Sequence, residues 1–274
     1  MWSSLALLTA ASGRVPPFQL AAISFAIGGG LGAATWALRP AALDALRQPP
    51  ELWALGVGGL FGYHALYFTA LRLAPPAEAG LINYLWPLLI VLFSGLSANE
   101  PLKAHHIAGA LLGLVGTIVL VASRGDLGFA GADTPGFAAA FAAAFVWATY
   151  SILSRRFANV RTDVVAAFCL ITAALAALCH VAFEDTVWPA SAVEWAATIG
   201  LGVGPVGLAF YAWDIGVKRG DIRVLGAASY AAPVLSTVLL VVAGFAEPSA
   251  SLALAAILIG GGGLLAAKDM LFGP

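Results

Sequence analysis

The sequence predicts an all-α membrane protein of ten transmembrane helices, built as two inverted five-helix repeats with the first helix truncated at its start. Three observations support this fold class. The 274-residue chain is 61% hydrophobic and only 10% charged, whereas a soluble domain carries about 25% charged residues. Apolar runs of membrane-spanning length recur from end to end, and the two halves of the chain resemble each other. Because this composition cannot cover a water-facing surface, we expect an integral protein of a lipid bilayer.

Nine apolar runs are long enough to cross a bilayer core, which requires about 20 residues of helix. Charged residues, prolines or glycine clusters separate neighbouring runs. The predicted spans are residues 16–38, 52–71, 77–98, 102–122, 135–157, 162–183, 194–216, 222–244 and 249–270. The opening stretch MWSSLALLTAASG is also apolar, but its 13 residues are too few to cross.

An internal duplication connects the two halves of the chain. The stretch LINYLWPLLIVLFSGLSANEP resembles LGAASYAAPVLSTVLLVVAGFAEP further along. Tyr84 then matches Tyr230 and Pro87 matches Pro233, each pair 146 positions apart. A constant offset of this kind indicates a repeated structural unit.

The duplication also explains the short opening stretch. Trp2 matches Trp147 at almost the same offset, and Trp147 lies about a dozen residues inside its predicted span. We therefore expect the native protein to begin upstream of Met1, so that the first helix is complete. The first repeat covers residues 1–122 and the second covers residues 135–270, within one integrated membrane domain. Five helices per repeat make the two copies enter from opposite faces, which is the inverted topology found in transporters.

The basic residues predict which side of the membrane each loop occupies. Ten of them fall on the side of the even-numbered loops and of both termini: Arg39, Arg47, Lys103, Arg155, Arg156, Arg161, Lys218, Arg219, Arg223 and Lys268. The other side carries Arg14, Arg72 and Arg124. Because cytoplasmic loops are enriched in Lys and Arg, we expect both termini in the cytoplasm.

The chain lacks the motifs of several other protein classes. It contains no HExxH, GxSxG or Walker sequence, so we expect neither an enzyme nor a bound cofactor. Cys169 and Cys179 are about 15 Å apart if helical, which excludes a disulfide, and they lack the spacing of metal ligands. The net charge of −1 gives no support to a nucleic-acid partner.

Glycines mark close-packing faces on two equivalent helices. Gly109, Gly113 and Gly116 lie on the fifth helix, and Gly260–Gly263 lie on the tenth. Small residues let helices approach each other closely in lipid. The two faces could meet each other, or they could form a homodimer with a second copy of the chain.

The candidate functional residues are aromatic and polar side chains well inside the spans. Tyr63 and Tyr67 are spaced i, i+4 on one helix, beside His64. The candidates for substrate binding are Tyr63, His64, Tyr67, Asn83, Tyr84, Trp86, Trp147, Tyr211, Trp213 and Tyr230. Tyr and Trp also form belts at the membrane surface, and this interpretation suits four residues near span ends, Trp36, Trp53, Trp188 and Trp195. A polar aromatic group deep in a span needs an internal partner, so we expect the candidates to line a polar cavity.

His64 and two prolines have more specific interpretations. An ionisable residue inside a span is a functional candidate by default. His64 could line the cavity, couple a transported substrate to protons, or only donate a hydrogen bond to a tyrosine or a backbone carbonyl. Pro87 and Pro233 interrupt equivalent helices, and a mid-span proline frees backbone carbonyl groups. We expect both prolines to act as hinges.

These features resemble the EamA family of the drug/metabolite transporter superfamily. The resemblance rests on the two inverted repeats, on Trp2 and Trp147 in equivalent first helices, on an EP dipeptide before each last helix, and on the stretch GYHALYFTALRLAPPAEAGLINYLWPLLIVLFS. It implies a bacterial inner-membrane exporter of amino acids that works by alternating access. It also implies a central cavity walled by Tyr63, His64, Tyr67, Tyr84, Trp86 and Trp147.

The residues favour aromatic and other neutral amino acids as substrates. Apolar and aromatic walls suit such side chains, whereas tyrosine, asparagine and freed carbonyl groups suit the ammonium and carboxylate groups. Away from their ends, the spans offer no Lys or Arg to bind a phosphate. An exporter of nucleobases, drugs or other small metabolites on the same fold is one alternative, and a non-transporting membrane scaffold is another.

Overall fold

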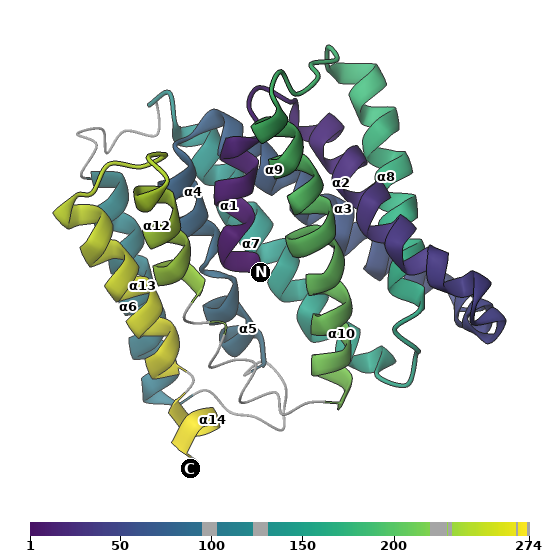
Figure 1. Cartoon of the computed structure of the whole chain (residues 1–274). Coiled ribbons are helices and arrows are strands. Elements are labelled where there is room, and N and C mark those ends of the chain that lie inside the picture. Colours follow the sequence, from purple (N-terminus) through teal and green to yellow (C-terminus); the bar gives the residue numbers. More distant parts are fainter. Residues whose placement is uncertain (95–102, 123–130, 220–228, 230–231, 267, 273–274) are drawn as a thin grey trace. The chain divides into compact units, whose positions relative to one another are not determined.

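The computed structural model describes residues 1–94, 103–122, 131–219, 229, 232–266 and 268–272, and these residues form helices joined by short connections (Figure 1). Among the described residues, five helices are long and apolar enough to cross a membrane: Pro17–Ala37, Pro50–Leu73, Thr134–Phe157, Val164–Phe183 and Ala192–Gly216. Three shorter apolar helices accompany them: Trp2–Ala11, Ala104–Val119 and Ala250–Ala266. The all-α membrane class is confirmed.

Residues 1–69 and 153–220 form one compact unit, unit 1. Its helices are α1 (Leu5–Ala11), α2 (Pro17–Ala34), most of α3 (Pro50–Leu73), α8 (Val164–Phe183), α9 (Ala192–Val203) and α10 (Ala209–Arg219). Its 3-10 turns are η1 (Trp2–Ser4), η2 (Thr35–Ala37), η3 (Pro40–Leu46) and η4 (Arg155–Phe157), and a π-helical turn, η5 (Gly204–Leu208), joins α9 to α10. Prolines begin α2 and α3, because the first turn of a helix does not need their missing N–H group.

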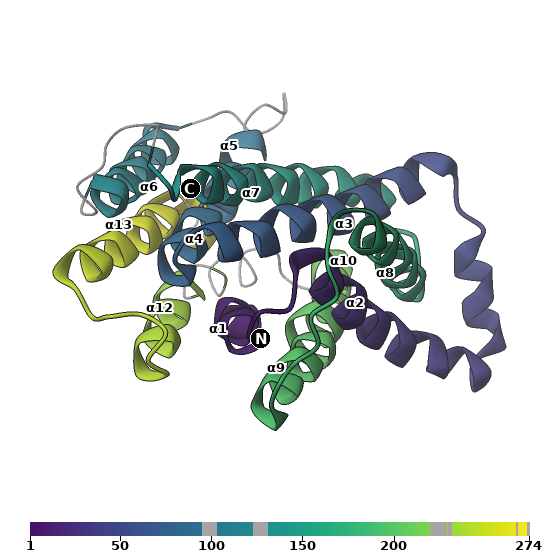
Figure 2. The same ribbon diagram turned by 90° about the horizontal axis from the view of Figure 1, so that it is seen from above.

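Glycines on α2 allow its neighbours in unit 1 to approach closely. A Cβ atom at Gly28 would lie 2.8 Å from the Cα atom of Gly207, and one at Gly29 would lie 2.9 Å from the backbone nitrogen of Leu170. Larger residues would push the helices apart at both positions. Accordingly, α2 packs along α8 and against α9 and η5 (Figure 2). The glycines at 28 and 29 therefore serve helix packing.

A glutamate fixes the start of α2. The carboxylate of Glu184, which follows α8, accepts hydrogen bonds from the backbone nitrogens of Phe18 at 2.9 Å and Gln19 at 3.0 Å. These are among the first N–H groups of α2, which have no partner within their own helix. His180 lies 3.0 Å from the same carboxylate and 2.9 Å from Thr186. The end of α8 is thus tied to the beginning of α2.

Residues 70–152 and 221–274 form the second compact unit, unit 2. Its helices are α4 (Pro76–Asn83), α5 (Trp86–Ser94), α6 (Ala104–Ala122), most of α7 (Thr134–Ser154), α12 (Ala232–Val242), α13 (Ala250–Ala266) and α14 (Lys268–Phe272). The glycine-rich helices α6 and α13 lie side by side (Figure 1). A Cβ atom at Gly262 would lie 2.6 Å from the carbonyl oxygen of Gly109, and one at Gly109 would overlap the carbonyl oxygen of Gly262. The glycine faces of α6 and α13 therefore meet each other within one chain. This is the first of the two arrangements that the sequence left open for them.

Candidate functional site

Tyr63, His64 and Tyr67 form an aromatic group on α3 in unit 1. The rings of Tyr63 and Tyr67 stack with their centroids 5.7 Å apart, as their spacing of one helical turn allows. The imidazole of His64 meets the Tyr63 ring edge-on at 4.7 Å. All three side chains are buried. The structure therefore brings three of the candidate residues together.

Phenylalanines surround His64. The ring centroids of Phe25 on α2, Phe68 on α3 and Phe210 on α10 lie 4.7, 5.3 and 5.4 Å from the imidazole centroid. The Nδ1 atom lies 3.0 Å from the carbonyl oxygen of Leu60. Because a carbonyl oxygen only accepts, Nδ1 carries the proton, and Nε2 of the neutral ring is an acceptor. His64 thus places one hydrogen-bond acceptor within an apolar wall. Sequence reasoning missed Phe25 and Phe210, which look like any other apolar residue of a span.

Trp2 and Trp213 form a second group in unit 1. Their ring centroids are 4.9 Å apart, and Phe210 lies 6.1 Å from Trp2. The indole nitrogen of Trp2 donates to the carbonyl oxygen of Pro205 at 3.1 Å. Pro205 belongs to the π-helical turn η5, where the regular α-helical hydrogen bonding is interrupted. An indole N–H therefore satisfies a carbonyl group of an irregular turn.

The helix that contains the LINYLWP sequence is broken in unit 2. The first segment, α4, ends at Asn83, and the second segment, α5, begins at Trp86, so the break lies at Tyr84 and Leu85. Pro87 falls in the first turn of α5, where its missing N–H costs nothing and its ring prevents a continuous helix through the preceding turn. The break thus lies two to three residues before the proline that causes it.

Trp86 and Trp147 meet in unit 2, although they come from different helices. Trp86 begins α5 and Trp147 lies on α7, and their ring centroids are 6.3 Å apart in an edge-to-face arrangement. Trp147 also contacts Tyr150, one turn further along α7, at 5.1 Å. Asn83 and Tyr84 are buried in the same unit. Tyr150 was not among the candidates from the sequence, although its i, i+3 spacing from Trp147 could have suggested it.

The remaining candidates lie apart from these groups or outside the described residues. Tyr211 and Trp213 are two positions apart on α10, which places them about 200° apart around the helix. Tyr211 faces α2, where its hydroxyl donates to the carbonyl oxygen of Gly28 at 3.0 Å. Pro233 lies in the first turn of α12, as Pro87 does in α5. Tyr230 lies outside the described residues.

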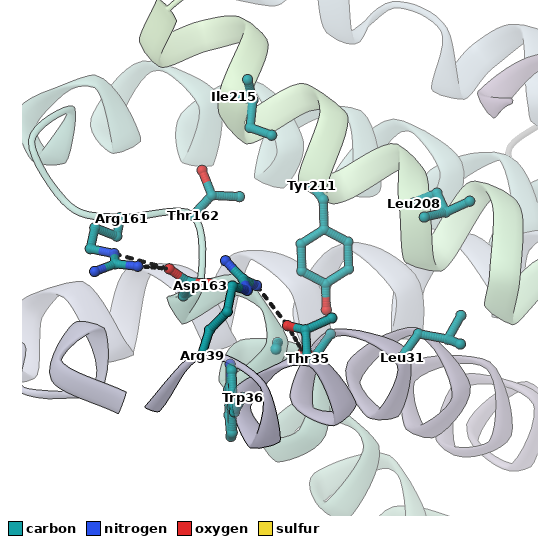
Figure 3. A pocket seen from close by; sticks show the side chains of 12 residues that line it. Leu31, Thr35, Trp36, Arg39, Arg161, Thr162, Asp163, Leu208, Tyr211 and Ile215 are labelled. Carbon is teal, nitrogen blue, oxygen red and sulfur yellow. Dashed lines mark hydrogen bonds and ion pairs between the residues drawn. The ribbon is translucent and has the colours of Figure 1, made fainter. Parts of the chain in front are cut away.

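A cavity of about 600 Å³ lies among α2, α8 and α10 in unit 1, and the sequence did not predict it (Figure 3). Its aliphatic and aromatic lining includes Leu31, Trp36, Leu208, Tyr211 and Ile215. Its polar lining includes Thr35, Arg39, Arg161, Thr162 and Asp163. Figure 3 shows the two arginines converging on Asp163 at one end of this space. No local sequence signal could have brought residues 39 and 161–163 together.

A charged cluster at the start of α6 holds α14. Lys103 forms an ion pair with Asp269, and Nε2 of His105 lies 3.5 Å from the same carboxylate. The hydrogen bond from Lys103, with the nearby His105, lowers the pKa of the Asp269 carboxyl below its usual value. His105, His106 and Asp269 are close enough to share a metal ion. However, the Lys103 ammonium occupies the carboxylate, and Nδ1 of His106 accepts the backbone N–H of Lys103 at 3.0 Å. The cluster is therefore best interpreted as a salt bridge.

The sequence is similar to known transporters over almost its whole length. The model of the EamA-like transporter family matches residues 1–122 and again residues 134–267. The aromatic amino acid exporter YddG of Ancylobacter novellus is 60% identical over 267 residues, which is 97% of this chain and 93% of that protein. The exporter of the same name from Escherichia coli K12 is 28% identical and covers 80% of this chain and 78% of that protein.

A solved structure shares the fold. A crystal structure of a protein with 60% sequence identity superimposes with a TM-score of 0.78, and the match covers 97% of this chain and 93% of the other. At this level of identity and overlap, the two chains share one fold.

Proposed function

Because the chain belongs to the EamA-like transporter family, we propose that it exports aromatic and other neutral amino acids across the bacterial inner membrane. One observation carries this proposal: 97% of the chain aligns at 60% identity with a protein named as an aromatic amino acid exporter. The buried groups around His64 and Trp147 support it, because aromatic walls with a few polar atoms suit the side chains of such substrates.

The topology that we propose has ten transmembrane helices in two inverted repeats, with both termini in the cytoplasm. The family model matches the chain twice, with the second match beginning at residue 134, which supports the repeats at 1–122 and 135–270. Pro87 and Pro233 both fall in the first turn of a helix, as equivalent positions should. Arg39 and Arg161 bind the same carboxylate, which supports their assignment to one side of the membrane.

We assign the substrate path to the aromatic candidates, with the two prolines as hinges for alternating access. Tyr63, His64 and Tyr67 line one part of the path, and Asn83, Tyr84, Trp86 and Trp147 line another. His64 supplies an acceptor for the substrate ammonium group, since its Nδ1 proton is used by Leu60. Trp213 and Tyr230 complete the set in the second repeat, whereas Tyr211 is engaged with Gly28. The contact between Gly109 and Gly262 supports a packing role within one chain, and a homodimer would need a further surface.

Efflux from proteoliposomes tests the function. Vesicles that contain the purified protein are loaded with labelled tryptophan, threonine or a drug cation, and efflux is measured with and without a pH gradient. We expect efflux of both amino acids, faster for tryptophan. Release of the drug cation alone would replace amino acids by drugs as the substrate, and no release of any compound would favour a membrane scaffold. A rate that is the same with and without the gradient would exclude proton coupling.

A further inference from the structure

The cavity among α2, α8 and α10 has an excess of positive charge at one end. Asp163 accepts from Arg161 through Nη2 at 2.8 Å and Nε at 3.0 Å, and it pairs with Nη2 of Arg39 at 3.1 Å. One carboxylate therefore faces two guanidinium groups, which leaves a net charge of +1. Asp214 accepts a hydrogen bond from Thr162 and does not line the cavity.

Arg39 and Arg161 differ in how many of their guanidinium nitrogens have a hydrogen-bond partner in the protein. Each of the three guanidinium nitrogens of Arg161 has a partner, because the third, Nη1, donates to the carbonyl oxygen of Ala41 at 3.3 Å. Arg39 uses only Nη2, which also donates to the hydroxyl of Thr35 at 2.6 Å. Within the described part of the chain, its Nε and Nη1 donate to no protein atom, and its side chain is 53% exposed. Arg39 thus keeps N–H groups at Nε and Nη1 for an anion; because the two lie on different sides of the guanidinium, each can donate one charge-assisted hydrogen bond.

The rest of the cavity is apolar and open on its outer side. Leu31 on α2, Leu208 at the end of η5 and Ile215 on α10 are 46%, 51% and 45% exposed. On helices that cross a bilayer, exposed aliphatic side chains contact lipid rather than water. An acyl chain that lies against these three residues would therefore replace contacts with bulk lipid at little cost.

The charged and apolar parts lie at the depths that a phospholipid requires. Arg39 follows the apolar span Pro17–Ala37 by two residues, so its guanidinium belongs to the headgroup region. Leu31 lies eight residues earlier, about 12 Å along the helix axis toward the bilayer core. Trp36 lines the cavity between these levels, as expected at a membrane interface.

We propose that this cavity binds an anionic phospholipid, with its phosphate on Arg39 and an acyl chain along Leu31, Leu208 and Ile215. A zwitterionic amino acid fits less well, because its ammonium group would lie beside the positive charges of Arg39 and Arg161, and Asp163 already pairs with both. Basic pockets between membrane helices are suited to acidic headgroups. This site is separate from the proposed substrate path, and its occupant is a lipid of the surrounding membrane.

Lipid binding to the delipidated protein tests the proposal. Binding of dioleoyl phosphatidylglycerol and dioleoyl phosphatidylcholine is measured by native mass spectrometry, with thermal unfolding as a second readout. We expect phosphatidylglycerol to bind and raise the Tm, and phosphatidylcholine to do neither. Arg39→Gln should weaken phosphatidylglycerol binding about fivefold, the effect of one basic residue near a lipid surface. Arg39→Lys, which keeps the charge, should lose less.

A matched control lies on the same connection. Arg47 is more exposed than Arg39 and contacts only Asp44 within the described residues. Arg47→Gln should leave phosphatidylglycerol binding unchanged, and an equal loss in both variants would overturn the site. Two further measurements distinguish a lipid from other ligands. In the first, glycerol phosphate, which has no acyl chains, should not raise the Tm. Displacement of the lipid by free tryptophan would instead assign the cavity to the transported substrate.

Discussion

The indoles of Trp86 and Trp147 pack edge to face with their centroids 6.3 Å apart, joining the start of α5 to the middle of α7. Both side chains are almost fully buried. Another tryptophan pair, Trp188 and Trp195, stacks at 6.0 Å but is exposed. The buried pair can therefore be substituted to test a role in transport, and the exposed pair provides a control with the same side chains.

Trp86→Ala and Trp147→Ala should each slow tryptophan efflux about tenfold, because each removes a wall of the proposed substrate path. The double variant should be little slower than either single one, since an aromatic pair contributes about 0.5–1.5 kcal/mol that is lost with the first substitution. Initial efflux rates from proteoliposomes measure this. Trp188→Ala is the control and should keep the parental rate. Parental efflux in both buried variants would make the pair purely structural.

His64→Phe should lower tryptophan efflux about tenfold while the protein still folds. Phenylalanine keeps the ring contacts with Phe25 and Phe210 but removes the Nε2 acceptor, and losing one buried hydrogen bond costs about 1–3 kcal/mol. The measurement combines efflux with the Tm in detergent. His106→Phe, at the more exposed start of α6, should leave efflux unchanged. If His64→Phe transports at the parental rate, His64 serves packing alone.

Gly109→Ala should lower the Tm, because its Cβ atom would overlap the carbonyl oxygen of Gly262. Overpacking of this kind costs about 1–3 kcal/mol. Gly261 is one position away from Gly262, and a Cβ atom there meets nothing within 4 Å. Gly261→Ala should therefore be neutral or slightly stabilising, since alanine is the better helix former. Thermal unfolding of the two variants in one detergent decides between them, and equal Tm values would contradict the close contact.

Glu184→Ala should destabilise unit 1 by about 0.5–2 kcal/mol, the range for losing a side chain that caps a helix start. The carboxylate serves two backbone N–H groups of α2, so both lose their acceptor at once. Its neighbour Asp185 is exposed, and Asp185→Ala is the matched control. The variants are compared by thermal unfolding, and hydrogen exchange at Phe18 and Gln19 should increase only in Glu184→Ala.

Asp269→Asn should lower the Tm at pH 7, and by progressively less as the pH falls below about 4. The pKa of Asp269 is lower in the folded protein than in the unfolded chain, so folding favours the ionised carboxylate. That stabilisation is present above the unfolded-state pKa of about 3.9 and is lost as the pH falls through the lower folded-state pKa. Tm values of the parent and the variant should therefore converge in acid. Asp44→Asn is the control, since Asp44 contacts an exposed arginine at 3.6 Å.

The sequence predicted those features that depend on local pattern. In lipid, a long apolar segment must satisfy its backbone hydrogen bonds internally, which a helix does. The all-α membrane class therefore followed from composition. Helical spacing placed Tyr63 beside Tyr67, and glycine content identified the faces at Gly109 and Gly262. The convergence of Arg39 and Arg161 on Asp163 could not be predicted, because it joins distant loops through tertiary packing. The phenylalanines around His64 were also missed, since an apolar residue in a span can face either lipid or protein.

The π-helical turn at η5 has a consequence for the evolution of this helix. A π-helical turn holds one residue more than a regular α-helical turn, so it advances the following helix by about 100°. Tyr211 reaches Gly28 and Trp213 reaches Trp2 only in this rotational phase. Removing a single residue from η5 would leave α10 helical and equally apolar, yet it would turn both rings to new neighbours. Insertions and deletions at this turn are thus a route by which related chains could exchange one set of wall residues for another without redesigning either helix.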